Sequence, residues 1–197
     1  MYDAVDDPYC YRGTTVLKNR LGLRTQAALD AFEAEATAQR FEEAFPAGRF
    51  TVAHYKAIHR HIFGDVYPWA GRERRVRISK GGSMFCYPEH ISAALRRLFA
   101  DLAKWRYLRG LTPEEFVVKG AAFLTELNAI HAFRDGNGRT QLAFFAILAA
   151  SAGHPLNLDR LAPEAFLAAM IASFGGNEAP LQAEIGRLVG LAPAPSL

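Results

Sequence analysis

The sequence lacks several features that mark common classes of protein. It has two cysteines, Cys10 and Cys86, which are too few for a disulfide framework and lack the paired spacing of a zinc site. Lys and Arg number 23 against 20 Asp and Glu, too small an excess to indicate a nucleic-acid-binding protein by itself. No apolar run is long enough to span a bilayer, and the acidic segment 1–7 does not resemble a secretory signal. We therefore expect a cytoplasmic protein with free thiols and no membrane or nucleic-acid partner.

The composition is that of one globular domain. Of the 197 residues, 50% are apolar and 22% are charged, which is enough to build a core and argues against general disorder. No repeat, low-complexity tract or long linker divides the chain. We predict a single domain over residues 1–197, made of an N-terminal extension (1–24), a helical core (25–174) and a C-terminal helix and tail (175–197).

The spacing of apolar residues predicts a mostly helical fold. Thr25 and Thr51 are placed to cap two helices, which should end near Phe45 and Gly64. Thr112, followed by proline and two glutamates, begins a central helix. Further helices are predicted over 89–108 and from residues 138, 163 and 180.

One segment departs from the helical pattern. Between residues 76 and 88, short apolar runs flank Lys80-Gly81-Gly82-Ser83, which is the composition of a β-hairpin. The fold class is therefore all-α, a helical bundle with one short β-hairpin. Four arginines precede this hairpin over residues 72–77. We interpret them as a solvated basic strand rather than a nucleic-acid groove, because no stacking aromatic residues lie between them.

The segment 131–139, His-Ala-Phe-Arg-Asp-Gly-Asn-Gly-Arg, combines the groups of a phosphoryl or nucleotidyl transfer site. It is predicted to lie between two helices. The glycines on either side of Asn137 allow positive φ, so that backbone N–H groups converge on an anion beside a helix N-terminus. Arg139 supplies a cation for phosphate oxygens, Asp135 a hard ligand for Mg²⁺, and His131 a general base near neutral pH.

Other motifs for nucleotides or metals are missing. The sequence has no Walker loop, and Gly136-x-Gly138 lacks the third glycine of a dinucleotide-binding fingerprint. Gly-Asn-Gly alone is an ordinary turn and a lone histidine an ordinary helix cap, so it is their joint occurrence that favours a functional site. His59 and His61 do not share a helix face and are not predicted to bind a metal.

This segment resembles the signature of Fic-domain proteins, His-Pro-Phe-x-Asp/Glu-Gly-Asn-Gly-Arg-x-x-Arg. The resemblance extends from about Tyr11 to Phe174. Three other blocks, in the family's order, resemble elements outside the signature: Val16-Leu17-Lys18-Asn19, Tyr67-Pro68-Trp69-Ala70-Gly71-Arg72 and Lys80-Gly81-Gly82. The resemblance implies the Fic fold and a protein adenylyltransferase, which transfers AMP from ATP to a Tyr, Ser or Thr hydroxyl of a target protein.

The resemblance also implies a role for each matching residue. His131 is expected to deprotonate the incoming hydroxyl, and Asp135 to hold Mg²⁺ against the phosphates of ATP. The nucleotide-binding residues are expected to be Asp135, Gly136, Asn137, Gly138, Arg139, Lys80 and Gly81. The hairpin is expected to be a flap that aligns a segment of the target by strand addition. Its docking residues are expected to be Ile78, Ser79, Lys80, Gly82, Met84 and Phe85.

Two positions depart from the signature. Ala132 replaces the proline, with a mild effect expected because no reactive group is lost. Leu142 replaces the second arginine, which in the family contacts the triphosphate. A charge-assisted hydrogen bond is worth about 1.5–3 kcal/mol, so nucleotide binding should be weaker, or the donor a different nucleotide. The alternative is a degenerate Fic fold that acts as a binding or regulatory module.

Regulation is expected to come from outside the chain. Many Fic proteins carry an inhibitory helix with the pattern Ser/Thr-x-x-x-Glu, and no Ser or Thr in this sequence has Glu four residues later. If the protein is regulated, we expect the regulator to be a separate small antitoxin-like protein or to act by another route. The sequence leaves open whether the protein acts in its own cell or is delivered into another.

Overall fold

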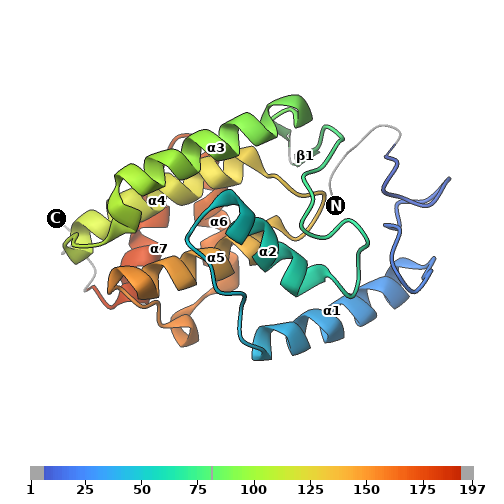
Figure 1. The fold of residues 1–197 in the computed structure, drawn as a ribbon, viewed down its shortest axis with the longest axis horizontal. Helices are drawn as coiled ribbons and strands as arrows, with labels where there is room; N and C mark the ends of the chain where they lie inside the picture. The colour runs from blue at the N-terminus through green and yellow to red at the C-terminus, as the bar shows by residue number, and fades with distance from the viewer. Residues whose placement is uncertain (1–6, 81, 192–197) are drawn as a thin grey trace. The chain divides into compact units, whose positions relative to one another are not determined.

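The computed structural model describes residues 7–80 and 82–191, which form seven α-helices, two short strands and two 3₁₀ helices (Figure 1). The chain divides into two compact units. One comprises the chain up to Ala93 together with His131–Thr140, and the other comprises Ala94–Ile130 and the chain from Gln141 onward. The mostly helical fold with one hairpin is confirmed, whereas the single domain over residues 1–197 stays a prediction.

In the first unit, helices α1 (Gln26–Glu42) and α2 (Val52–Phe63) pack side by side (Figure 1). Both predicted caps are present: the hydroxyls of Thr25 and Thr51 accept hydrogen bonds from backbone N–H groups in the first turn of each helix. Helix α1 ends three residues before Phe45, the predicted end. Helix α2 buries the apolar residues that recur every three or four positions, Tyr55, Ile58 and Ile62.

The predicted hairpin is present in the first unit but its strands are short. Strands β1 (Ser79–Lys80) and β2 (Ser83–Met84) pair antiparallel, with Ser79 opposite Met84. Gly82 turns the chain with a φ of 80°, a conformation that glycine adopts at low cost. Gly81 lies outside the described residues.

The second unit is built around α4 (Pro113–Ile130), which packs against α6 (Pro163–Phe174) and α7 (Ala179–Val189). Helix α4 begins at the predicted position with a capping box: the Thr112 hydroxyl accepts from Glu115 N–H, and the Glu115 carboxylate accepts from Thr112 N–H. Both later helices begin within one residue of the predicted prolines. The two 3₁₀ helices are η1 (Arg106–Leu108) and η2 (Leu158–Arg160).

Two helices contribute residues to both units. These are α3 (Pro88–Lys104) and α5 (Asn137–Ala152). The helix predicted over 89–108 thus ends at Lys104, after which η1 follows. Cys10 and Cys86 are free thiols. Within the described ranges, no helix is both long enough and apolar enough to cross a bilayer.

Candidate active site

The segment 131–136 joins the end of α4 to the start of α5, as the predicted break between two helices requires. Helix α5 begins at Asn137, so Gly138 lies in its first turn and is exposed. Only Gly136 of the two glycines has positive φ, at 76°. The expectation that both glycines provide such a turn is therefore wrong, because Gly138 is helical.

The side chain of Asn137 closes the loop on itself. Its Oδ1 accepts from the N–H of Phe133 at 2.9 Å, and its Nδ2 donates to the carbonyl of Phe133 at 2.8 Å. Asn137 is buried, so the contribution left for it in an anion site is its backbone N–H. The first N–H groups of a helix have no acceptor within the helix, which makes the start of α5 suited to a phosphate.

Two apolar contacts fix the loop against α2. Phe133 is fully buried, and its ring lies 3.8 Å from the ring of His59 and 5.2 Å from that of Tyr55. A Cβ on Gly136 would lie only 2.3 Å from the ring of Phe63. The glycine is therefore required here both by its φ and by the close approach of an aromatic ring.

His131 directly follows α4 and is 6% exposed. Its φ of 47° is in the left-handed region, which costs a residue other than glycine about 1–2 kcal/mol. The imidazole stacks on the ring of Phe85, with centroids 3.8 Å apart and an interplanar angle of 16°. The proposed base thus lies beneath a residue of the hairpin.

Charged groups of both signs surround Asp135. Arg139 forms an ion pair with Glu33 of α1 at 2.6 Å, and its guanidinium lies 4.5 Å above the ring of Phe63. Tyr67 donates its hydroxyl to the same Glu33. Burial raises the pKa of Asp135, and the nearby charge of Glu33 raises it further, while the N–H of Gly136 and the charge of Arg139 act in the opposite direction.

His59 contacts the loop in a way that the sequence did not predict. Its Nδ1 accepts from the N–H of Gly71 at 2.9 Å, so its Nε2 carries the proton and donates to the carbonyl of Asp135 at 3.0 Å. Burial lowers the pKa of His59 from 6.5 to about 4, with the charge of Arg139 acting in the same direction. The neutral ring is therefore a structural contact of the loop.

The arginine-rich segment is only partly solvated. Arg72 and Arg75 are exposed, but Arg74 is 2% exposed and bonds to backbone carbonyls of the loop and the hairpin. The prediction of a solvated basic strand is therefore wrong for Arg74, and residues 72–77 precede β1 instead of forming a strand. No periodic signal in the sequence separates this arginine from its neighbours.

The residues predicted to dock a target fall into two groups. Ile78 and Phe85 are buried, at 1% and 8% exposed, so their side chains belong to the interior. Lys80 and Gly82 are exposed, and Met84 is 50% exposed. Ser79 is half-buried at the start of β1. The exposed residues predicted to dock a target, Lys80, Gly82 and Met84, thus lie at the tip of the hairpin. Its stem, residues 76–79 and 85–86, carries Ile78 and Phe85 inward.

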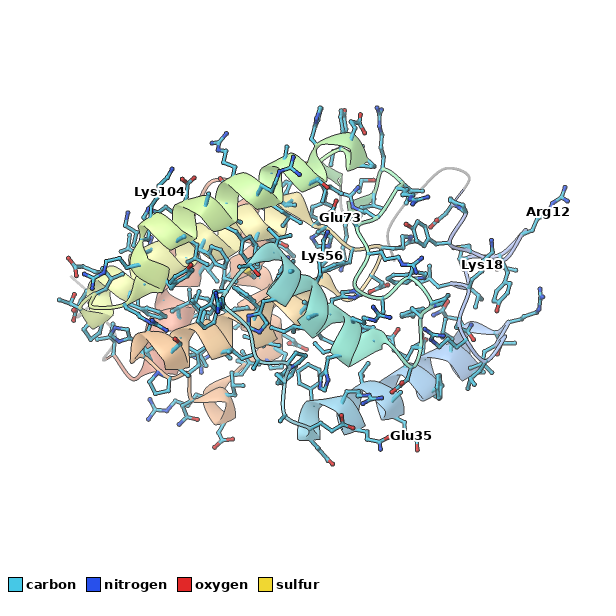
Figure 2. All side chains as sticks on the ribbon, viewed as in Figure 1. Arg12, Lys18, Glu35, Lys56, Glu73 and Lys104 are labelled. Atoms are coloured by element: carbon cyan, nitrogen blue, oxygen red, sulfur yellow. The ribbon has the colours of Figure 1, made fainter. Side chains whose placement is uncertain are left out.

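A cavity of about 930 Å³ lies in the first unit, and its wall includes Arg74, which bonds to the loop. The ion pair between Lys56 and Glu73, at 2.5 Å, forms part of its wall, and Figure 2 shows the two side chains beside each other. None of residues 131–139 lines this cavity. Its wall is made of Pro8, Tyr9, Lys56, Trp69, Gly71, Arg72, Glu73, Arg74, Arg75, Pro88 and Glu89.

Comparison with known proteins identifies the family. The model of the Fic/DOC family matches residues 49–149, a range that contains the loop, the hairpin and the segment with Arg74. The chain belongs to the Fic/DOC family. The family resemblance stated from the sequence is thereby confirmed, while the loss of an arginine at Leu142 stays a prediction.

Similar proteins match the sequence of this chain over nearly its whole length. The probable protein adenylyltransferase y4lH of Sinorhizobium fredii is 51% identical over 95% of this chain and 98% of its own length. The protein adenylyltransferase VbhT of Bartonella schoenbuchensis is 39% identical over 94% of this chain but only 40% of its own length. These relatives identify the chain as an enzyme of the nucleotidyltransferase class.

The fold is also that of solved Fic/DOC structures. The BepC protein of Bartonella tribocorum, a VirB-translocated effector crystallised with bound AMPPNP, matches with a TM-score of 0.82 and 26% identity. The match covers 91% of this chain and 95% of that chain. The N-terminal Fic domain of a VirB-translocated Bep effector protein from Bartonella quintana, which matches with a TM-score of 0.84 and 28% identity over 91% of this chain and 93% of that chain, confirms the predicted Fic fold.

We predict that Gly136→Ala destabilises the protein by more than about 2 kcal/mol, because it combines a positive φ with a clash against Phe63. Gly138→Ala is the matched control: a Cβ there meets nothing within 4 Å, and alanine favours the helix. Chemical denaturation of both variants measures the difference. Equal stabilities would contradict the loop geometry.

We predict that His59 makes the protein less stable as the pH falls from 6.5 to 4. In this window the unfolded chain binds a proton at His59 and the folded chain does not, so the free energy of unfolding should fall by about 3 kcal/mol. His59→Gln keeps an N–H donor without titrating, and should remove that part of the pH dependence. The control His61→Gln, on the same helix, should retain it. If the free energy of unfolding falls equally with pH in His59→Gln and in the wild type, the ring of His59 is not held neutral in the folded protein.

Proposed function

We propose that this enzyme transfers AMP from ATP to a Tyr, Ser or Thr hydroxyl of a target protein. The observation that carries the proposal is the loop 131–139, in which an imidazole, a carboxylate, a guanidinium and the start of a helix lie on one short segment. The names of the relatives, protein adenylyltransferase, and the AMPPNP bound to BepC support the donor and the reaction.

The phosphates of ATP are proposed to bind at the first turn of α5. Backbone N–H groups of Asn137 and Gly138 supply hydrogen bonds without a side chain, and Arg139 supplies positive charge. Gly136 contributes the turn that precedes them, since its own N–H donates to the carboxylate of Asp135. The guanidinium has five N–H donors, and Glu33 engages it through Nη2. Glu33 can therefore hold the orientation of Arg139 while other donors bind a phosphate. Lys80 and Gly81 of the hairpin remain proposed nucleotide contacts.

Asp135 is the residue proposed to hold Mg²⁺. Its carboxylate is a hard oxygen donor, and its Oδ1 is already oriented by the N–H of Gly136. Among the described residues, no group of three or more His, Cys, Asp or Glu side chains is placed to hold a metal. A single carboxylate fits Mg²⁺ because this ion takes most of its other ligands from phosphates and water. When bound, the ion would neutralise charge on the phosphates.

His131 is proposed to accept the proton of the target hydroxyl. The hydroxyl oxygen then forms a bond to the α-phosphorus of ATP, and the bond from that phosphorus to the bridging oxygen breaks, which releases pyrophosphate. Phe85 covers a face of the imidazole, whereas the nitrogen lone pairs of a histidine lie in the ring plane. The stacking therefore holds the ring without occupying the position of the hydroxyl.

The target is proposed to dock along the tip of the hairpin. Lys80 and Gly82 are exposed at the proposed site of strand addition, and the exposed Met84 offers an apolar contact. We also propose that a separate small protein inhibits the enzyme. The proposed compartment is a reducing cytoplasm. Two free thiols are consistent with such a compartment.

We expect His131→Ala to lower protein labelling from α-labelled ATP and Mg²⁺ in a cell lysate by about 100-fold or more, because general-base catalysis contributes at least that much. His90→Ala removes an exposed histidine near the start of α3 and serves as the control. It should label like the wild type. Undiminished labelling by His131→Ala would refute the assignment of the base.

We expect Leu142→Arg to tighten ATP binding by about 10–100-fold, since it adds one charge-assisted hydrogen bond to the triphosphate. Titration calorimetry with ATP and Mg²⁺ measures the change, and Leu142→Gln, which is polar but uncharged, is the control. Labelling with UTP and GTP tests the alternative donors. If neither the wild type nor Leu142→Arg binds any nucleotide at millimolar concentration, a binding or regulatory module replaces the proposed enzyme.

A further inference from the structure

Arg74 is a fully buried cation that bonds to the backbone on both sides of the candidate active site. Its Nε donates to the carbonyl of His131 at 2.8 Å. Its Nη1 donates to the carbonyl of Val76 at 2.7 Å, and its Nη2 to the carbonyl of Cys86 at 2.5 Å. One planar group thus joins the proposed base to the two sides of the hairpin stem.

The backbone of Arg74 adds a fourth contact to the same loop. Its N–H donates to the carbonyl of Ala132 at 2.9 Å, directly after His131. Two consecutive carbonyls of the loop are therefore fixed by one residue. Such contacts can stabilise the left-handed backbone of His131, which is otherwise unfavourable for a side chain with a Cβ.

The contact with Cys86 connects this arginine to the stacking of His131. Cys86 follows Phe85, whose ring lies 3.8 Å from the imidazole. The guanidinium therefore fixes the backbone beside each of the two stacked rings. The stacking of the imidazole on Phe85 depends on both backbones, since the guanidinium fixes the distance between the two residues that carry the rings.

We propose that Arg74 is a positioning residue for the transfer reaction, which orients the imidazole of His131 by fixing the loop and the hairpin stem together. The inference rests on the proposed function of His131 as the base. Arg74 is buried and bonds to backbone carbonyls, so it acts through His131 and Phe85 rather than on the substrate. A lysine cannot replace it, because an ammonium lacks the flat fork that reaches three carbonyls in different directions.

The nucleotide site should be largely independent of Arg74. Asn137 and His59 hold the part of the loop that precedes α5, at the carbonyls of Phe133 and Asp135. Loss of the guanidinium should therefore misplace the base while it leaves the phosphate contacts in place. This separation distinguishes a positioning role from a general loss of structure.

The test compares Arg74→Lys with the control Arg72→Lys, which changes an exposed arginine two residues away. We expect Arg74→Lys to lower the labelling rate by about 10–100-fold, the effect of displacing a catalytic group by about an ångström. Its dissociation constant for ATP and Mg²⁺, measured by calorimetry, should change less than about threefold, a difference well under 1 kcal/mol. Arg72→Lys should match the wild type in both measurements.

Nuclear magnetic resonance of histidine-labelled protein supplies a readout that does not depend on the proposed function. The ring protons of His131, assigned with His131→Ala, should be shifted upfield by the stacked ring of Phe85 in the wild type. In Arg74→Lys they should move toward the values of an unstacked histidine, and in Arg72→Lys they should stay. If the wild type transfers no nucleotide, the proposed function fails, and this signal alone decides the positioning role.

Three results would overturn the proposal: unchanged labelling and an unchanged His131 signal in Arg74→Lys, loss of ATP affinity in step with the labelling rate, or a changed rate with the His131 ring still stacked. A second measurement covers an Arg74→Lys protein that does not fold. In the wild type, the Nε proton of Arg74 should exchange slowly with water and show cross-relaxation with protons of His131. Rapid exchange would contradict the buried bridge.

Discussion

The structure of the candidate active site depends on satisfying the buried backbone carbonyls of one short loop. A buried carbonyl without a partner costs about 1–3 kcal/mol, and most carbonyls of this loop are not paired by a strand or a helix. Side chains pair three of them: the carbonyl of His131 with Arg74, that of Phe133 with Asn137 and that of Asp135 with His59. The carbonyl of Ala132 accepts from the backbone N–H of Arg74, and that of Gly136 from the N–H and the hydroxyl of Thr140 in α5. The conformation that exposes a helix start to a phosphate is therefore fixed mainly by side chains.

The charges around this loop are balanced in pairs. Arg134 and Asp7 form a buried ion pair at 2.6 Å, and Arg139 pairs with Glu33. Breaking a buried pair leaves an uncompensated charge, which is far more costly than losing an exposed one. Arg134 is thus committed to the structure, although it lies in the middle of the signature segment. Arg139 remains half-exposed, and it is the arginine of this segment that we propose to bind a phosphate.

The hairpin has two parts with different physical roles. Its stem carries Ile78 and Phe85 inward, where Phe85 stacks on His131 and the backbone bonds to Arg74. Its tip carries Lys80 and Met84 outward. Substitutions in the stem would act on the orientation of the proposed base, whereas substitutions at the tip would act on the proposed docking of a target. The hairpin therefore also supports the proposed base, His131.

The sequence by itself determined the features that depend on neighbouring residues. The caps at Thr25, Thr51 and Thr112, the hairpin and the break before α5 all follow from residues within a few positions of each other. The signature segment also identified the family, since its residue types occur in a fixed order. Its two glycines were not equivalent, because helix α5 begins before Gly138 and only Gly136 turns the chain.

Only the tertiary structure decided which side chains hold the loop. Arg74 and His59 reach carbonyls 57 and 76 positions away, and no local pattern distinguishes them from the exposed arginines and the half-buried His61 nearby. Every residue has a backbone carbonyl, so a side chain that donates to one needs no particular residue type as its acceptor. Such a hydrogen bond therefore leaves no complementary signal in the sequence. Both polar side chains are buried and hold the loop of the candidate active site. Burial is a property of the packed chain, so the sequence alone did not show it.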